Sequence, residues 1–288
     1  MSEGTKKDKQ KKDRLINLCL VGVLLLGLMI LGYPTFANWW NSFHQSRAVA
    51  AYMRAVANLD PEEYDRVISE AEAYNGRLAM TGIIWNMDEA QLEEYNQILD
   101  ITGTGIMGYI DIPKASVTLP IYHGSDEAVL QIAIGHLEGT SLPVGGVSSH
   151  CVVTGHRGLP SARLFTDIDK LVKGDTFTLT VMNRTLTYEV DDIHIVEPTD
   201  LSNISITQNQ DYCTLVTCTP YGINSHRLLV RGKRTENAAG TANVTADAMQ
   251  LKPVYVAPLV ATPMLFVLLL GILIKTRKPK KEGDSHGK

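Results

Sequence analysis

Residues 214–232 read TLVTCTPYGINSHRLLVRG, and this stretch predicts a β-hairpin with reactive groups at its rim. Apolar and β-branched residues dominate 212–217 and 227–231, and the sequence between these runs is typical of a turn. Cys218 then ends the first strand and Arg227 begins the second, so we expect their side chains to face each other across the rim. A fixed cation near a thiol favours the thiolate and can stabilise an oxyanion.

A cysteine nucleophile also needs a proton donor for a leaving amine, and histidine is the usual one. The sequence VVTGHRG at 152–158 places His156 where a predicted strand runs into a glycine-flanked turn. His226 is the alternative, because it is next to Arg227. Adjacent residues of a strand point to opposite faces, so His226 and Arg227 face one site only if the strand is distorted. The pattern therefore favours His156.

From residue 105 onward, short apolar runs alternate with Gly, Pro, Asn and Asp, which is typical of β-strands. We predict strands at 107–112, 117–121, 151–154, 176–181, 185–190, 193–196, 212–217 and 227–231. A flat sheet of this size would leave edges to protect. The sequence therefore predicts a mainly β fold with a closed or nearly closed eight-stranded barrel.

Helical spacing precedes the barrel and recurs once within it. Over 46–99, Asp60 and Pro61 fit the N-cap and first turn of one helix, and Asp88 lies near the N-terminus of another. Residues 161–173 also have helical spacing, and we expect them to form a helix against the barrel.

Two apolar segments, 15–31 and 254–274, each approach the length that a membrane-spanning helix needs. Basic residues precede the first and follow the second, so the positive-inside rule predicts that both tails are cytoplasmic and the region between them is extracytoplasmic. That region is acidic, which argues against nucleic acid as a partner. A signal peptide cleaved after Ala37 is the alternative for the first segment. The length of this first segment and the Trp39-Trp40 pair that follows it favour an uncleaved anchor.

Cysteine usage agrees with an extracytoplasmic domain that has a reactive thiol. Cys19 lies in the first apolar segment, which leaves Cys151, Cys213 and Cys218 outside the membrane. Three cysteines cannot all pair within one chain, so at least one of them should be a free thiol. Cys213 is an odd number of positions from Cys218 and should face away from it, so Cys151 and Cys213 are interpreted as buried strand residues.

Several motifs in order along the chain resemble the sortases, the cysteine transpeptidases of Gram-positive cell surfaces. The TLVTC run and the PYGINSHRLLVRG that follows its Thr219 occur together with TGHRGLP. The resemblance extends over roughly 34–275 and points to class C, the pilin-polymerising sortases. The further motifs that carry it are MGYIDIP at 107–113, LPIYHG at 119–124, GHLEGTSLPVGG at 135–146 and LFTDIDKL at 164–171.

The resemblance implies a sortase-type barrel with membrane-proximal N-terminal helices and two flanking transmembrane helices. It implies Cys218 as nucleophile, His156 as acid and base, and Arg227 as the stabiliser of the oxyanion or the substrate. The thiolate would cleave an LPxTG-like sorting signal between Thr and Gly, and a lysine amine of the next pilin subunit would resolve the thioester. These steps need no metal and no organic cofactor. The expected partners are the membrane and pilin or surface-protein substrates.

Class C sortases typically carry an Asp-Pro-aromatic lid between the membrane-proximal helix and the barrel, and this chain departs from that pattern. The corresponding stretch reads IIWNMDE at 83–89. We hypothesise that Trp85 takes the aromatic role of the lid and that Asp88 is a weaker candidate for the acidic role. The alternative is that Trp85 is a hydrophobic staple for the helix that follows.

Two other functions remain open at this point. One is a housekeeping sortase that anchors surface proteins to peptidoglycan. The other is a non-enzymatic surface-binding module with zinc held by Cys213, Cys218, His156 and His226, although the Cys-x4-Cys spacing splits the two thiols between faces of a strand.

The resulting domain prediction divides the chain into seven parts. They are a cytoplasmic basic tail (1–14), a transmembrane anchor or signal (15–33), an extracytoplasmic helical region with the lid (34–104), a catalytic barrel (105–234), a flexible linker (235–253), a transmembrane helix (254–274) and a second cytoplasmic basic tail (275–288).

Overall fold

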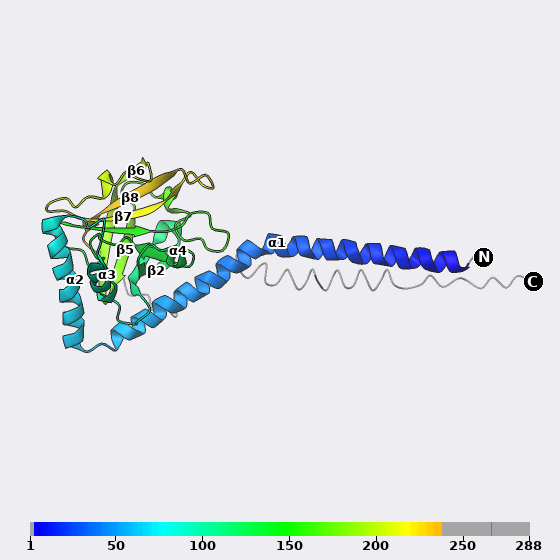
Figure 1. Ribbon diagram of the computed structural model, residues 1–288, viewed down its shortest axis with the longest axis horizontal. Helices are drawn as coiled ribbons and strands as arrows, with labels where there is room; N and C mark the ends of the chain where they lie inside the picture. Colours follow the sequence, from blue (N-terminus) through cyan, green and yellow to red (C-terminus); the bar gives the residue numbers. More distant parts are fainter. Residues whose placement is uncertain (1–2, 238–265, 267–288) are drawn as a thin grey trace, which may run out of the picture. The chain divides into compact units, whose positions relative to one another are not determined.

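A long N-terminal helix leads into a closed β-barrel in the computed structural model, which describes residues 3–237 and Phe266 (Figure 1). Helix α1 (Glu3–Ala57) is continuous through Pro34. Within the described part of the chain it is the one helix that is long and apolar enough to cross a membrane, as predicted for its first apolar segment. The second predicted membrane segment, at 254–274, lies outside the described residues apart from Phe266.

Eight strands close the barrel in the order β1-β2-β3-β4-β7-β8-β6-β5. The pairs β2–β3 and β4–β7 are parallel, and the other pairs are antiparallel. The strands are β1 (Ile106–Ile112), β2 (Val117–His123), β3 (Ile134–His136), β4 (Ser149–Thr154), β5 (Thr176–Val181), β6 (Arg184–Val196), β7 (Asp211–Thr219) and β8 (His226–Thr235).

The closed eight-stranded barrel confirms the predicted fold class, but two strands differ from the prediction. Strand β3 was not predicted, because three residues are too few to display an alternating pattern. The runs predicted at 185–190 and 193–196 form one strand, β6, whose register shifts between Val190 and Asp192. Two consecutive aspartates at this bulge break the alternation of apolar residues, which is why the sequence reads as two strands.

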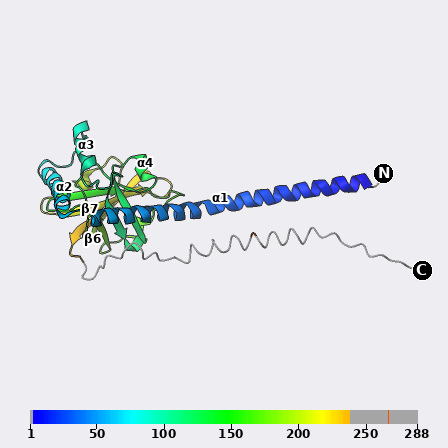
Figure 2. The same ribbon diagram turned by 90° about the horizontal axis from the view of Figure 1, so that it is seen from below.

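Two helices with clear N-caps lie beside the barrel, α2 (Pro61–Thr81) and α3 (Glu89–Gln97) (Figures 1 and 2). The Asp60 carboxylate accepts a hydrogen bond from the backbone N–H of Glu63, and Pro61 occupies the first turn. Asp88 and Gln91 form a reciprocal capping box at the start of α3. Both predicted helix starts are therefore confirmed, because each has an Asp whose side chain satisfies N–H groups that have no partner within the helix.

The helix predicted over 161–173 is wrong. This segment contains turns and one short 3-10 helix, η2 (Ile168–Lys170). Leu164 has a φ of 35°, which ends any α-helical path through it. The buried side chains of Leu164, Phe165, Ile168 and Leu171 explain the helix-like spacing, since they pack into the barrel core from a series of turns.

The remaining short elements lie in the connections between strands. They are η1 (Pro113–Ala115), the one-turn helix α4 (Glu127–Leu130) and η3 (Ser202–Ile204).

Apolar side chains form a large interior core and a small second cluster on the outer face of the sheet. The interior core includes Leu215, Cys213 and Leu228. The outer cluster contains Val152, Val196, Ile204 and Leu229, with Val216 and Leu137 packed against it. Consecutive residues of β7 and β8 thus alternate between the interior and an outer face that the β6–β7 connection covers at Ile204.

Polar groups attach the helices to the barrel. The Tyr52 hydroxyl donates to the Met107 carbonyl and accepts from the Met182 N–H, both at 2.8 Å. Asn75 of α2 bonds the N–H and carbonyl of Leu142 and the carbonyl of Gly145, at 2.7, 3.0 and 3.2 Å. Each of these buried side chains satisfies backbone groups that no strand or helix pairs.

Candidate active site

Cys218 and Arg227 are directly opposite each other near the ends of β7 and β8. Their same-face neighbours one step along the strands are Val216 and Leu229, which both belong to the outer cluster. Strand alternation therefore places Cys218 and Arg227 on the outer face, beside that apolar cluster. Cys218 is partly exposed, so a substrate has access to it.

His156 follows β4, the other neighbour of β7. The parallel register pairs Thr154 with Val216, and the ladder continues for one more residue through the N–H of Gly155, which donates to the Val216 carbonyl at 3.1 Å. The Thr217 hydroxyl also donates to the Gly155 carbonyl at 2.7 Å. This extension brings His156 level with Cys218. Cys218 and Arg227 lie on β7 and β8, and His156 lies two residues beyond β4. We call these three residues the rim trio.

The Arg227 guanidinium is held by the turn that joins β7 and β8. Its Nη1 donates to the carbonyls of Asn224 and His226, both at 3.2 Å. A guanidinium has five N–H donors, so it can hold these two contacts and still donate to a bound oxygen. The arrangement supplies a thiol, an imidazole and a fixed cation on one face.

His156 has one acidic neighbour, which sequence reasoning missed. Its Nε2 lies 3.4 Å from Glu127 Oε2 in α4. Glu127 is the first residue of the one-turn helix α4 and directly follows Asp126, and no spacing or motif in the sequence indicates its contact with His156. The pairing arises because α4 connects β2 to β3, next to the end of β4.

The other histidines of the part of the chain that the structure describes have partners of their own. His226 contacts Glu197 at 3.5 Å and the Ser225 hydroxyl at 2.9 Å, and it is the neighbour of Arg227 on a strand with alternating faces. His136 is buried between the Tyr95 hydroxyl and the Ser141 carbonyl, both at 2.9 Å. It fixes the β3–β4 connection to α3.

His150 fixes the β6–β7 connection to the barrel. Its Nδ1 donates to the Ser205 carbonyl at 2.9 Å, and its Nε2 accepts from the Thr214 hydroxyl at 2.7 Å. Burial lowers the pKa of His150 to about 4, so the ring is neutral near pH 7. The connection that it holds carries Ile204, which packs beside the rim trio.

The two other barrel cysteines are buried and opposed. Cys151 of β4 and Cys213 of β7 are register partners and are 2% and 0% exposed. Burial and the neighbouring Cys151 raise the pKa of Cys213. Their positions agree with the interpretation of both as interior strand residues.

This placement contradicts the zinc-site alternative. Cys213 faces the interior, whereas Cys218 is on the outer face, so the two thiols cannot bind one tetrahedral ion. Within residues 3–237, no group of three His, Cys, Asp or Glu side chains is arranged to hold a metal.

The structure attaches the predicted lid segment to the β3–β4 connection. The Ile84 N–H donates to the Gly139 carbonyl at 3.1 Å, and any side chain at Gly139, which has a φ of 77°, would collide with the Ile84 backbone. Trp85 is 45% exposed, and the Asp88 carboxylate is engaged in the capping box of α3. The contacts of this segment thus join it to Gly139, to the interior core through Ile84 and Met87, and to its own helix.

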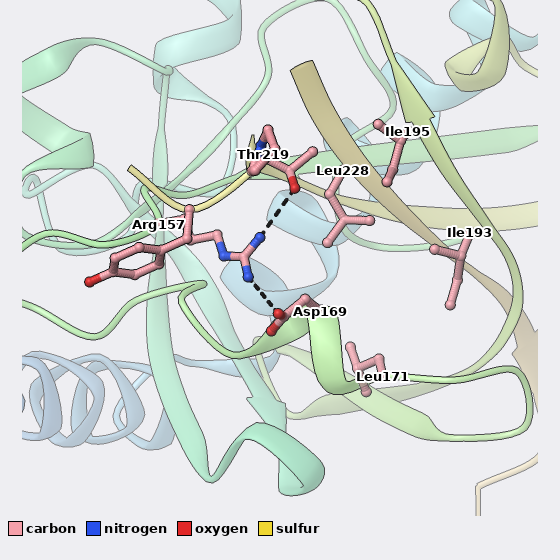
Figure 3. A pocket seen from close by; sticks show the side chains of 9 residues that line it. Arg157, Asp169, Leu171, Ile193, Ile195, Thr219 and Leu228 are labelled. Carbon is pink, nitrogen blue, oxygen red and sulfur yellow. Dashed lines mark hydrogen bonds and ion pairs between the residues drawn. The ribbon is translucent and has the colours of Figure 1, made fainter. Parts of the chain in front are cut away.

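A pocket of about 700 Å³ lies at the strand ends that carry the rim trio, but none of the trio lines it (Figure 3). Arg157, Thr219 and Leu228 line it, and each directly follows one member of the trio in sequence. The Arg157 guanidinium lies between the Thr219 hydroxyl, at 3.3 Å, and the Asp169 carboxylate. The rest of the wall is largely apolar, with Leu171, Ile193, Ile195, Pro220 and Tyr221.

Comparison with known proteins finds sortases by sequence and by structure. The sortase domain model matches residues 110–235. Sortase D of Bacillus subtilis (strain 168) is 31% identical over 130 residues, which are 44% of this chain and 63% of that protein. Sortase A of Streptococcus agalactiae serotype III (strain NEM316) is 30% identical over 40% of this chain and 47% of its own length. The match thus covers less than two thirds of these curated relatives.

Solved structures match more completely. The crystal structure of sortase C1 from Streptococcus agalactiae is 51% identical, with a TM-score of 0.65, and the match covers 66% of this chain and 99% of that one. Sortase C of Streptococcus pneumoniae is 42% identical, with a TM-score of 0.61 and coverage of 66% and 97%. With a closed barrel of this topology and these matches, the chain belongs to the sortase family of cysteine transpeptidases, and its structural neighbours are class C sortases.

Proposed function

We propose that this protein is a membrane-anchored class C sortase that cleaves LPxTG-like sorting signals between Thr and Gly and joins pilin subunits through lysine isopeptide bonds. The observation that carries the proposal is the placement of Cys218, His156 and Arg227 on one outer face, across β4, β7 and β8. The related sortase C of Streptococcus pneumoniae is described with a pilin substrate specificity, and that of Clostridium perfringens with a C-terminal cell wall sorting motif.

The first half of the reaction transfers the substrate to the thiol. The Cys218 thiolate attacks the Thr carbonyl carbon, and the C–N bond to Gly breaks as the His156 imidazolium gives its proton to the departing amine. Arg227 donates hydrogen bonds to the oxyanion that forms before this bond breaks. The products are a thioester on Cys218, a neutral His156 and a free glycine amine.

The second half joins the acyl group to an acceptor. A neutral lysine amine attacks the thioester carbon, the C–S bond breaks and the thiolate returns. The amine proton passes to His156, which restores the imidazolium. Every proton and bond is thereby accounted for by Cys218, His156 and the two substrates.

The topology proposed for the whole protein places the barrel outside the cell, with α1 as its anchor. The apolar first part of α1 supports an anchor. A second transmembrane helix at 254–274 and two cytoplasmic basic tails, at 1–14 and 275–288, complete the proposal on the basis of the sequence.

Intact-protein mass spectrometry of the full chain in detergent micelles tests the function. Incubation with an LPxTG-containing peptide should add the mass of the acyl fragment to the wild type and release a peptide that begins with Gly. Cys218→Ala should add nothing, whereas Cys213→Ala should still acylate. An adduct that persists in Cys218→Ala would contradict the proposed nucleophile.

The acceptor distinguishes the pilin-polymerising function from the housekeeping one. One sample of the acylated enzyme receives a pilin segment that carries an acceptor lysine. A second sample receives a peptide that mimics the amine of the cell-wall precursor. Faster resolution by the pilin lysine is expected, and preference for the wall amine would identify a housekeeping sortase.

A further inference from the structure

The one-turn helix α4 connects β2 to β3 and presents an acidic side chain to the rim trio. Glu127 is its first residue, and its Oε2 lies 3.4 Å from His156 Nε2. The other carboxylate oxygen, Oε1, accepts a hydrogen bond from the side-chain amide of Gln131, one turn later. Gln131 therefore orients the carboxylate, and the second carboxylate oxygen faces the imidazole.

The imidazole also depends on this contact. His156 Nε2 is buried, and within the described residues no hydrogen-bond partner of good geometry reaches it. Glu127 is the single acidic group within 4.0 Å of the ring in that part of the chain. A buried ring nitrogen with one acidic neighbour carries its proton most readily toward that neighbour.

A surface ion pair without function is the plain alternative. The Glu127 side chain is 69% exposed and that of His156 is 26% exposed. Exposed pairs contribute little to stability, typically about 0–1 kcal/mol. Two features weigh against an incidental contact: the imidazole is a member of the rim trio, and Gln131 fixes the orientation of the carboxylate.

We propose that Glu127, oriented by Gln131, is a positioning residue for His156 that holds its Nε2–H and stabilises the imidazolium. This inference rests on the proposed function, since it assigns a role within the same reaction. Fixing one ring nitrogen leaves Nδ1 for proton exchange with the reacting groups. A nucleophile, a base and a third group that orients the base together form a recurrent arrangement in covalent catalysis.

The charge balance of the site agrees with this assignment. The hydrogen bond from Gln131 and the charge of His156 both lower the pKa of Glu127, so the carboxylate is ionised at neutral pH. Cys218 and Arg227 are the other ionisable members of the rim trio. Arg157 adjoins His156 but is paired with the Asp169 carboxylate, and His226 is paired with Glu197. Arg227 opposes a positive charge on the imidazole, and Glu127 offsets it.

The test compares Glu127→Gln with Asp126→Asn in the full chain in detergent micelles. Asp126 is exposed, precedes Glu127 and makes no side-chain cap for α4, so its variant removes the same charge without touching the imidazole. Acylation by an LPxTG-containing peptide is followed as kcat and KM from pH 5 to pH 9. Thermal unfolding of each variant checks that the fold is intact.

The proposal predicts that Glu127→Gln lowers kcat by about twofold to fivefold with KM unchanged, as expected for the loss of one partly exposed pair. The alkaline limb of the pH profile moves to lower pH, because the imidazolium loses its stabilising charge. Asp126→Asn retains the wild-type profile. Gln131→Ala, which keeps all charges, moves kcat in the same direction as Glu127→Gln.

If Glu127→Gln kept the kcat and the pH profile of the wild type, the proposal would be overturned and the proposed function would stay in place. Equal changes in Glu127→Gln and Asp126→Asn would also overturn it, since they would show a general charge effect. Failure of the wild type to acylate at all would instead contradict the proposed function, and this inference with it.

Discussion

Cys218 and Arg227 form a cross-strand pair, so their relative position is set by the register of β7 and β8 and not by a flexible loop. Directly opposed residues have Cβ atoms about 5 Å apart and side chains on the same face. The backbone carbonyls of Asn224 and His226 hold the guanidinium. The backbone thus fixes a cation on the face that carries Cys218 before any substrate binds, which is the condition for electrostatic preorganisation.

Replacing Arg227 by Ala should therefore reduce catalysis much more than stability. Loss of one preorganised donor to an oxyanion typically lowers the rate by about 10²–10³-fold, and we expect this fall in kcat/KM for acylation. Steady-state kinetics with an LPxTG-containing peptide measures it, and chemical denaturation measures the free energy of unfolding.

Arg231→Ala is the matched control, on the same face of β8. Arg231 donates to both Asp191 oxygens, at 3.0 and 2.8 Å, and lies over the Tyr212 ring at 4.3 Å. Its removal should lower the free energy of unfolding by about 1–2 kcal/mol and leave turnover intact. A similar loss of turnover in both variants would mean that Arg227 has no special role.

The Trp85→Ala variant should acylate like the wild type. The lid hypothesis requires Trp85 to cover Cys218, whereas the neighbouring Ile84 is bonded to Gly139 and the Trp85 ring is nearly half exposed. The measurement is the rate of acyl-enzyme formation by mass spectrometry. Faster acylation in Trp85→Ala would support a lid, and Gln91→Ala, which removes the Gln91 half of the α3 capping box, separates that effect from simple loosening of the helix.

Stability should fall between about pH 6.5 and pH 4 because of His150. Burial lowers its pKa from 6.5 to about 4, so in this range the unfolded chain binds a proton that the folded chain excludes. The free energy of unfolding is therefore about 3 kcal/mol higher above pH 6.5, where the ring is neutral in both states, than below pH 4. Burial lowers the pKa of His123 as well and acts in the same direction, whereas burial raises that of Asp211, which opposes it at the acid end.

Chemical denaturation at several pH values tests this contribution. His150→Gln should flatten the slope between pH 6.5 and pH 4, and the exposed His44→Gln should leave the slope as in the wild type. The same protonation removes the Nε2 acceptor of the Thr214 hydroxyl and places a charge under the β6–β7 connection, so acylation should also decline in this acidic range. An unchanged slope in His150→Gln would show that another group dominates.

Asn75→Leu should destabilise the fold by about 2–4 kcal/mol, since it leaves the N–H of Leu142 and the carbonyl of Gly145 without their partner and removes one of two bonds to the Leu142 carbonyl. The free energy of unfolding from denaturant titration gives the value. Asn96→Leu, on the exposed side of α3, is the control and should change it by no more than about 0.5 kcal/mol. Equal effects would mean that the α2–barrel contact is not a significant source of stability.

The barrel was predictable because its strands contain clear local signals. Alternation, turn residues and two Asp N-caps identified most elements. The bounds predicted for β5, 176–181, are the observed ones. The failures have physical causes. The bulge in β6 interrupts the alternation, β3 is too short to show one, and the turns around Leu164 bury side chains at a spacing that imitates a helix.

The candidate site was also predictable only in part from the sequence. Cys218, Arg227 and His156 lie at strand ends, so strand periodicity and turn positions were enough to place them on one rim. Glu127 reaches the rim through the path of the β2–β3 connection, which no local pattern encodes. Contacts between elements that are distant in sequence depend on the closure of the barrel and become visible only in three dimensions.

The opposed Cys151 and Cys213 have a practical consequence for quantitative enzymology. Both sulfurs are sealed in the interior, and Cys19 lies in the apolar part of α1, so a charged, membrane-impermeant thiol reagent meets Cys218 first. Stoichiometric labelling then serves as an active-site titration. It counts the competent centres in any preparation and converts observed turnover into a rate constant per centre.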